Sequence, residues 1–139
     1  MNPVRDSTVS DIIMKPCPFC FDAVKDRIVA EQNTVVAIKD GYPVTDGHLL
    51  IIPKRHVEGY FSLNESEKKD VDDLIMKLKG RIIDNDPSVT GFNIGVNIGE
   101  SAGQTIFHAH IHLIPRRKGD TPNPRGGVRG VIPDRMSYY

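Results

Sequence analysis

The sequence predicts an α+β domain in which an antiparallel sheet of about five strands carries one main helix. Short β-branched segments lie before and after a single long helical pattern, and no strand-helix-strand alternation suggests a parallel sheet. The chain has 139 residues, of which 39% are hydrophobic and 26% charged. It is therefore long enough and apolar enough to bury the core of one domain.

Five segments have the composition of strands. Segments 27–32 and 34–39 are short and rich in β-branched residues. Segment 48–53 (HLLIIP) is an almost continuous apolar run, which indicates a strand buried on both faces. Segment 91–98 alternates apolar and polar residues, as a half-buried strand does. The fifth segment, 105–114, holds three histidines and is the most unusual stretch of the chain.

One helix is predicted between the third and fourth strands. Asn64 followed by Glu67 has the spacing of a capping box, which marks a helix start. The dipeptide Asp86-Pro87 predicts its end, because the residue before a proline disfavours helical geometry. Apolar residues recur between these limits at helical spacing and predict one buried stripe: Val71, Leu74, Ile75, Leu78 and Ile82.

Charge and hydropathy exclude several classes of protein. The 18 basic and 18 acidic residues balance, which argues against a polyanion binder driven by net charge. No stretch approaches the ~20 apolar residues of a membrane span. The N-terminal residues lack the apolar core of a secretory signal, so we expect a cytoplasmic protein with neither membrane nor nucleic acid as a partner. Basic residues nevertheless exceed acidic ones by six to two from Pro115 onward.

Three alternating histidines, His108, His110 and His112, are the strongest functional signal. On a regular strand they would share one face, and three imidazoles in a row are poor packing material. Two interpretations compete: a metal site, or one imidazole as a nucleophile with another as proton donor. The preceding loop, 97–105, favours the second because its glycines, hydroxyls and amides suit an oxyanion, and the basic tail adds countercharge.

These residues resemble the histidine triad (HIT) superfamily of nucleotide hydrolases and transferases. The motif GQTIFHAHIHLIPR carries the resemblance, and VVAIKDGYPVTDGHLLIIPKRH is similar to a second conserved block of that family. CPFC resembles the Cys-x-x-Cys of its zinc-carrying bacterial branch, whose members include Hint-like and Fhit-like nucleotide hydrolases. The resemblance covers about residues 17–116. We therefore expect residues 1–139 to form a single HIT domain with a HIT-like fold and an irregular basic tail, 117–139.

The resemblance implies a role for each matching residue. His110 would attack the α-phosphorus and become a nucleotidyl-histidine, and His112 would donate to a phosphate oxygen or the leaving group. Asp40 would accept from the ribose hydroxyls. The expected phosphate-binding groups lie in the loop before the triad: Asn97, Gly103, Gln104 and Thr105.

The implied reaction is hydrolysis of a dinucleoside polyphosphate or a nucleoside phosphoramidate, with a purine nucleotide as substrate and a homodimer as the assembly. The third histidine argues against the uridylyltransferase branch, which usually has Gln there. Two alternatives stay open: a phosphorylase or nucleotidyltransferase that uses another acceptor than water, and a non-catalytic nucleotide-binding protein.

The zinc-carrying members also suggest a structural Cys₂His₂ zinc site at Cys17, Cys20, His56 and His108, while the chemical step needs no metal. A regular strand would aim His108 and His110 to the same side, so the zinc must lie close to His110 or the strand must be bulged. We interpret His48, which precedes a buried strand, as a core residue or a support for the site.

A redox protein is the main rival. Cys-Pro-Phe-Cys is a plausible thiol motif of a glutaredoxin-like oxidoreductase. Such a motif requires a strand before it and a helix after it within a β-α-β unit. The residues after Cys20 predict at most a turn before a strand, and the rival leaves the three histidines unexplained.

Overall fold

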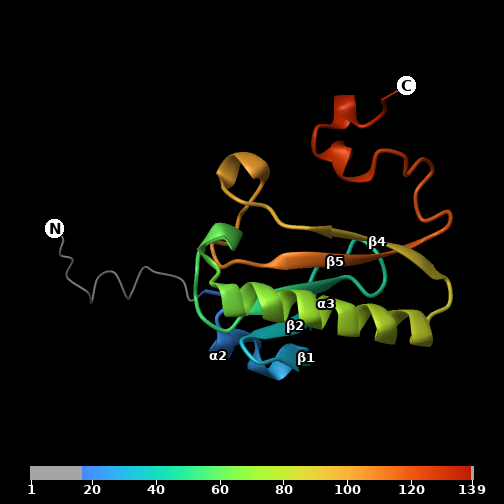
Figure 1. Ribbon diagram of the computed structural model, residues 1–139. Coiled ribbons are helices and arrows are strands. Elements are labelled where there is room, and N and C mark those ends of the chain that lie inside the picture. Colours follow the sequence, from blue (N-terminus) through green and yellow to red (C-terminus); the bar gives the residue numbers. More distant parts are fainter. Residues whose placement is uncertain (1–16, 139) are drawn as a thin grey trace.

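A computed structural model of the protein, which describes residues 17–138, shows a five-stranded sheet (Figure 1). Its order is β1-β2-β3-β5-β4, and all neighbouring strands are antiparallel. The predicted fold class is therefore confirmed, with strands β1 (Ile28–Gln32), β2 (Val35–Lys39), β3 (Leu49–Pro53), β4 (Val89–Gly95) and β5 (Ile111–Arg117).

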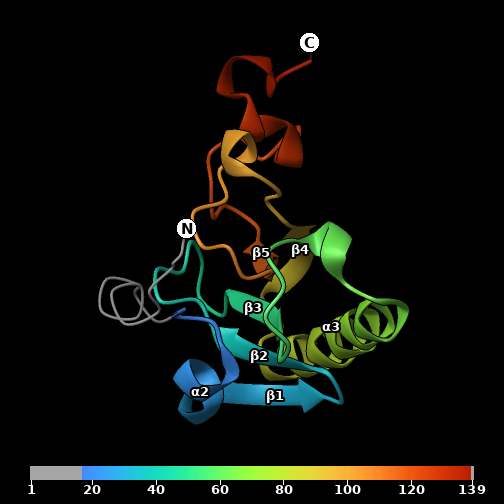
Figure 2. The same ribbon diagram turned by 90° about the vertical axis from the view of Figure 1, so that its left-hand side faces the viewer.

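The main helix, α3 (Glu65–Asn85), lies along one face of the sheet (Figure 2). Its predicted capping box is present: Asn64 accepts from the Glu67 backbone N–H, and Glu67 accepts from the Asn64 backbone N–H. The predicted stripe packs on the inner residues of β2, β3 and β5, with Leu74 fully buried. Most of the core lies in this layer.

The opposite face of the sheet has a smaller core. Val36, Ile38, Leu50 and Ile52 point to this side and are covered by Phe19 and Val24 from the start of the described chain. The covering segment comprises two short helices, α2 (Phe21–Val24) and η1 (Lys25–Arg27). All five residues of β3 are buried, as the apolar run predicts. Cys17 packs on this smaller core, on the face that does not carry α3, and Cys20 directly precedes α2.

The strand predicted over 105–114 begins only at Ile111 and continues to Arg117. Before Ile111 the backbone leaves the ladder, and the Ala109 N–H donates to the Val57 carbonyl at 2.7 Å. The side-chain alternation survives this change, because Ala109, Ile111 and Leu113 are all buried. It fails at Phe107, which is 43% exposed. The fourth strand is also displaced, covering 89–95 where 91–98 is predicted.

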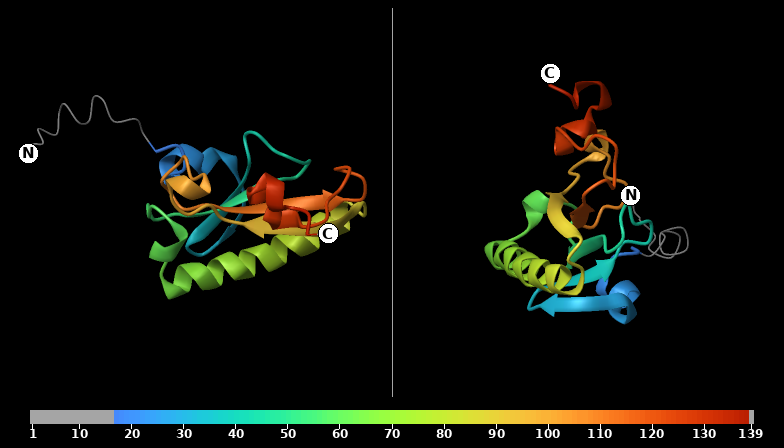
Figure 3. Two further views of the ribbon diagram at one scale, coloured as in Figure 1. Left: turned by 90° about the horizontal axis from the view of Figure 1, so that it is seen from above. Right: turned by 90° about the vertical axis from the view of Figure 1, so that its right-hand side faces the viewer.

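The remaining elements are short connections. They are η2 (Tyr60–Ser62), η3 (Glu100–Ala102), η4 (Gly127–Val131) and η5 (Pro133–Arg135). The last two belong to the tail, which extends beyond the sheet on the side of β4 and away from α3 (Figure 3). Within residues 17–138, no helix is both long and apolar enough to cross a membrane.

Candidate active site

The three histidines occupy two kinds of backbone. His112 lies in β5, opposite Leu50 of β3 and Gly95 of β4. Cross-strand partners share a face, so His112 lies on the face that also carries Leu50, away from α3. His108 and His110 lie in the irregular segment before β5 and can therefore turn independently of the strand alternation.

Of the two ring nitrogens of His110, only Nδ1 has a hydrogen-bond partner among residues 17–138. Its Nδ1–H donates to the His108 carbonyl at 2.9 Å. A carbonyl only accepts, so this bond places the proton of a neutral His110 on Nδ1 and the lone pair on Nε2. Within residues 17–138, no partner is found for Nε2. Phe19 meets the ring edge-on, with the ring centroids 4.9 Å apart.

The free side of His110 opens on a cavity of about 370 Å³. The second and third triad histidines line it together with all but one of the residues expected to bind a nucleotide. These lining residues are Asp40, Asn97, Gly103, Thr105, His110 and His112. Phe19 forms part of its wall, as does Arg27. A cavity of this size, part apolar and part polar, suits a small-molecule ligand.

The exception is Gln104, which is expected at the phosphate but is only 4% exposed. Its Oε1 accepts from the Gly99 N–H at 2.9 Å, and its Nε2 donates to the carbonyls of Glu58 and Ile106. Every polar group of the side chain is thus hydrogen-bonded to the backbone, both in the loop and at Glu58. Gln104 holds the loop in shape and has no donor left for a phosphate.

The loop requires a glycine beside Gln104. Gly103 has φ of +95°, a left-handed conformation that side chains with a Cβ rarely adopt. This turn follows η3 and leads the chain toward His108. Asn97 and Thr105, on either side of the turn, face the cavity. The geometry therefore offers an amide and a hydroxyl near the two triad histidines.

His112 is connected to two residues outside the triad. Its Nδ1 lies 2.9 Å from His48 Nε2, and His48 Nε2 lies 3.3 Å from Asp40 Oδ2. The Asp40 Oδ1 accepts from the Tyr42 backbone N–H. Burial lowers the pKa of both His48 and His112, against the opposing charge of Asp40, so the neutral form of each ring is favoured.

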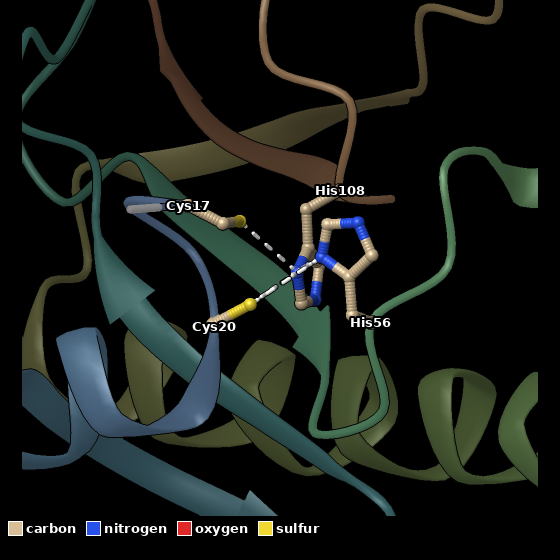
Figure 4. Close-up of side chains that lie close together, drawn as sticks. All are labelled: Cys17, Cys20, His56 and His108. Atoms are coloured by element: carbon tan, nitrogen blue, oxygen red, sulfur yellow. Dashed lines mark hydrogen bonds between the residues drawn. The ribbon is translucent and has the colours of Figure 1, made fainter. Parts of the chain in front are cut away.

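The four residues expected to bind zinc come together (Figure 4). His108 Nδ1 lies 3.5 Å from Cys17 Sγ, 3.8 Å from Cys20 Sγ and 3.1 Å from His56 Nδ1. Cys20 Sγ lies 3.3 Å from His56 Nδ1. His108 is fully buried, and its Nε2–H donates to the Pro53 carbonyl at 2.9 Å. That bond leaves the lone pair of Nδ1 directed at the two sulfurs.

The donor set fits a tetrahedral zinc ion. With Zn–N distances of about 2.0–2.1 Å and Zn–S distances of about 2.3 Å, neighbouring ligand atoms lie roughly 3.3–3.8 Å apart. The distances between the four donors are close to that range. The carbonyl that fixes the His108 tautomer is the kind of support that metal-binding histidines commonly have. The irregular backbone before β5 also allows His108 to turn toward this cluster while His110 turns to the cavity.

Sequence reasoning missed Arg27 and gave His48 no specific role. Arg27 donates to the Lys39 carbonyl at the cavity wall, and nothing in its local sequence signals that position. His48 follows Gly47 in a turn, and only its distance to His112 reveals the contact. Val128 and Val131 of the tail line a separate apolar cavity of about 370 Å³ beside His112, which no motif predicts.

Comparisons with known proteins identify one family. The family model described as "HIT domain" matches residues 22–119. A Bacillus subtilis relative named "Protein hit" is 40% identical over 108 residues, which is 75% of this chain and 74% of the relative.

Two further matches carry functional names. A Mycobacterium tuberculosis relative named "AP-4-A phosphorylase" is 36% identical over 94 residues, which covers 67% of this chain and 48% of the relative. The crystal structure of a Zn-bound histidine triad family protein from Mycobacterium smegmatis superposes with a TM-score of 0.68 at 30% identity. That match covers 77% of this chain and 79% of the other.

Proposed function

The chain belongs to the HIT domain family, and from that premise we propose that it is a nucleotide hydrolase. It cleaves at the α-phosphorus of a dinucleoside polyphosphate or a nucleoside phosphoramidate through a nucleotidyl-His110 intermediate. The observation that carries the proposal is the state of His110. Its Nδ1–H is hydrogen-bonded to the His108 carbonyl, and its ring lines the cavity with an Nε2 that has no partner among residues 17–138. An imidazole held in this way is a nucleophile that needs no further activation.

In the first step, the Nε2 lone pair of His110 forms a bond to the α-phosphorus. The bond from phosphorus to the leaving group breaks, and its electron pair departs with the leaving oxygen or nitrogen, which takes a proton from solvent where it needs one. The His112 N–H and the groups of Asn97 and Thr105 support this step by hydrogen-bonding the phosphate oxygens as charge develops. Asp40, which also lines the cavity, is suited to accept from a ribose hydroxyl.

In the second step, a water oxygen attacks the same phosphorus. The electron pair of the N–P bond returns to His110 Nε2, the spare proton of the water passes to solvent, and a nucleoside monophosphate is released. The carbonyl of His108 keeps the proton of His110 on Nδ1 in both steps, so Nε2 is restored as the nucleophile.

We assign the Cys₂His₂ cluster to a structural zinc ion held by Cys17, Cys20, His56 and His108. Four protein ligands leave no open coordination position, so the ion supplies rigidity and no part of the chemical step. Its effect on the site would be indirect, because the carbonyl that orients His110 belongs to His108.

The decisive experiment compares nucleoside monophosphate release by the wild type and His110→Ala. The panel contains diadenosine tri- and tetraphosphate, adenosine phosphoramidate and a nucleotide sugar. We expect His110→Ala to lower kcat by more than about 10⁴-fold, because it removes the nucleophile. Nucleotide binding, measured by calorimetry with adenosine monophosphate, should persist. Wild-type rates in the variant would contradict the covalent route.

A phosphorylase is the second candidate, and it is favoured by the relative named for that activity. Repeating the panel with and without inorganic phosphate separates the two. Turnover that needs phosphate, with a nucleoside diphosphate as product, would assign the chain to phosphorolysis. A wild type that binds nucleotides without turning any of them over would instead support a binding protein.

We also propose that two copies associate along β4 into one sheet. β4 ends the strand order, and Ile94 on it is 50% exposed. Light scattering of the intact chain tests this assembly, with twice the 15.5 kDa chain mass as the expected result.

A further inference from the structure

The contact between His48 and His112 determines where the protons of both rings lie. His48 Nδ1 lies 3.1 Å from the backbone nitrogen of Val44. A backbone amide can only donate, so His48 Nδ1 must accept and carries no proton. A neutral imidazole keeps one proton, and that proton is therefore on His48 Nε2.

His48 Nε2–H has two acceptors within reach. His112 Nδ1 lies at 2.9 Å and Asp40 Oδ2 at 3.3 Å. For His112 to donate in the opposite direction, His48 Nε2 would have to be unprotonated. His48 would then carry no proton at all, which is not an accessible state of imidazole near neutral pH. His112 Nδ1 is consequently an acceptor, and the proton of His112 is on Nε2.

We propose that His48 is a positioning residue that holds His112 in one state, a neutral imidazole with its proton on Nε2. This inference rests on the proposed function, in which His112 donates to a phosphate oxygen, and specifies how it does so. His112 acts as a fixed hydrogen-bond donor in place of an imidazolium acid. A second proton, on Nδ1, would point directly at the Nε2–H of His48.

The surroundings of the pair agree with this assignment. His48 is only 3% exposed, and the neighbours of His112 on β3 and β4 are Leu50 and Gly95, which carry no charge. The titratable or charged groups that face the pair are Asp40, after β2, and His110, before β5. The Arg129 guanidinium on η4 bonds to carbonyls of the tail itself. Asp40 shares the Nε2–H of His48 and orients that ring.

The same assignment argues against a metal at this position. Asp40, His48 and His112 place a carboxylate and two imidazoles close enough to hold an ion. A metal would need the lone pair of His48 Nε2, and that atom carries the proton as long as Val44 donates to Nδ1. We therefore expect one zinc ion per chain, at the cysteines, and no second ion here.

Nitrogen NMR of the full chain as purified, with labelled histidine at pH 7, tests the proposal directly. Long-range proton–nitrogen spectra distinguish the two neutral tautomers and the imidazolium. We expect His48 and His112 each to have a bare Nδ1 and a protonated Nε2. A proton on Nδ1 of His112, alone or as imidazolium, would overturn the proposal whatever the activity.

Two variants separate positioning from packing. His48→Gln places an N–H near the position of Nε2, whereas His48→Leu fills the space without a donor. In His48→Leu we expect a mixture of tautomers at His112 and a fall in kcat of about 10- to 100-fold, with KM changed less than about threefold. His48→Gln should recover most of the loss.

Equal losses in His48→Gln and His48→Leu, with His112 unchanged in the spectra, would show that His48 only packs. If the wild type turns over no substrate, the proposed function fails, while the spectra still decide the state of His112. Should His48→Leu not fold, the wild-type and His48→Gln spectra suffice.

Discussion

Backbone groups give chemically identical histidines different roles. The Pro53 carbonyl accepts a hydrogen bond from the Nε2–H of His108, and the His108 carbonyl accepts one from the Nδ1–H of His110. The Val44 amide leaves His48 with its proton on Nε2. Because a carbonyl only accepts and an amide N–H only donates, each contact selects one tautomer. A buried ring with a fixed tautomer presents either a lone pair or a donor, and the fold decides which.

His112 should matter less than His110 because it supplies a donor and forms no bond to phosphorus. We expect His112→Ala to lower kcat by about 10²- to 10³-fold, the usual effect of losing one donor to developing negative charge. Single-turnover release of nucleoside monophosphate measures this loss. The burst of nucleotidyl-His110 should still form, more slowly.

His112→Gln is the matched control, since its amide N–H can replace part of the lost donor. It should be faster than His112→Ala. A loss in His112→Ala as large as in His110→Ala would mean that His112 takes part in bond making, contrary to the assigned role.

The types of site residue could be predicted from sequence, but their orientations could not. The spacing of His108, His110 and His112 indicates the chemistry, yet it would aim all three to one face. The structure turns His108 to the cysteines because the backbone before Ile111 bonds to Val57 in place of a neighbouring strand. Gln104 fits a phosphate contact by motif, but three backbone partners occupy its side chain.

At the scale of elements, the start of α3 is bound to the chain segment that carries His56. Glu67, in the first turn, accepts from Arg55 through both of its oxygens, at 2.8 and 3.1 Å. It also closes the capping box with Asn64. Glu67 is 2% exposed, so these contacts are shielded from water. The capping box therefore fixes the helix and the segment next to the metal cluster together.

This arrangement predicts a pH dependence of stability. The hydrogen bond from Arg55, helped by the Asn64 N–H and opposed by burial, lowers the pKa of Glu67. Its stabilising effect is thus complete above the unfolded pKa of about 4.5 and is lost as the pH falls toward the folded value. Thermal unfolding should show a lower Tm for Glu67→Gln than for wild type at pH 7, and a smaller difference at pH 3.

Glu65→Gln is the control on the same turn, because Glu65 is 98% exposed and its nearest cation, Lys68, is 3.8 Å away. It should leave Tm almost unchanged at both pH values. A Glu67→Gln deficit that stays constant from pH 7 to pH 3 would show that the effect comes from packing rather than from the ionised carboxylate.

Elements with a strong periodic signal were predictable, and those shaped by distant contacts were not. The helix follows from its capping box and apolar stripe, which are local in sequence. The boundaries of β4 and β5 depend on each other, because their pairing runs from Val89 opposite Arg117 to Gly95 opposite His112. A single sequence gives the alternation of a strand but contains no local signal for where its partner ends.

At the scale of the molecule, segments far apart in the chain meet at one cluster. Cys17 and Cys20 precede β1, His56 follows β3, and His108 precedes β5. The N-terminal segment covers only part of the face opposite α3, with a small core around Val24. A metal ion at this position would hold that segment on the sheet and support the wall that Phe19 contributes to the cavity.

Substitution of one zinc-binding residue should therefore lower the stability of the protein more than its activity. We expect about one zinc ion per chain by elemental analysis of protein purified without chelator, and far less in Cys17→Ser. An ion present at about 1,000-fold its Kd contributes about 4 kcal/mol to folding. For a chain of this length that equals a fall in Tm of roughly 10–15 °C. The kcat of the folded variant should change much less than its Tm.

The double variant Cys17→Ser/Cys20→Ser supplies a sharper test of the zinc site. Losing either cysteine opens the tetrahedral site, so Cys17→Ser and Cys20→Ser should each release the ion, and the combination should lower Tm little further. Two independent thiol contacts would instead give additive losses. Additive losses, or a wild type with no bound zinc, would show that the four side chains merely pack together.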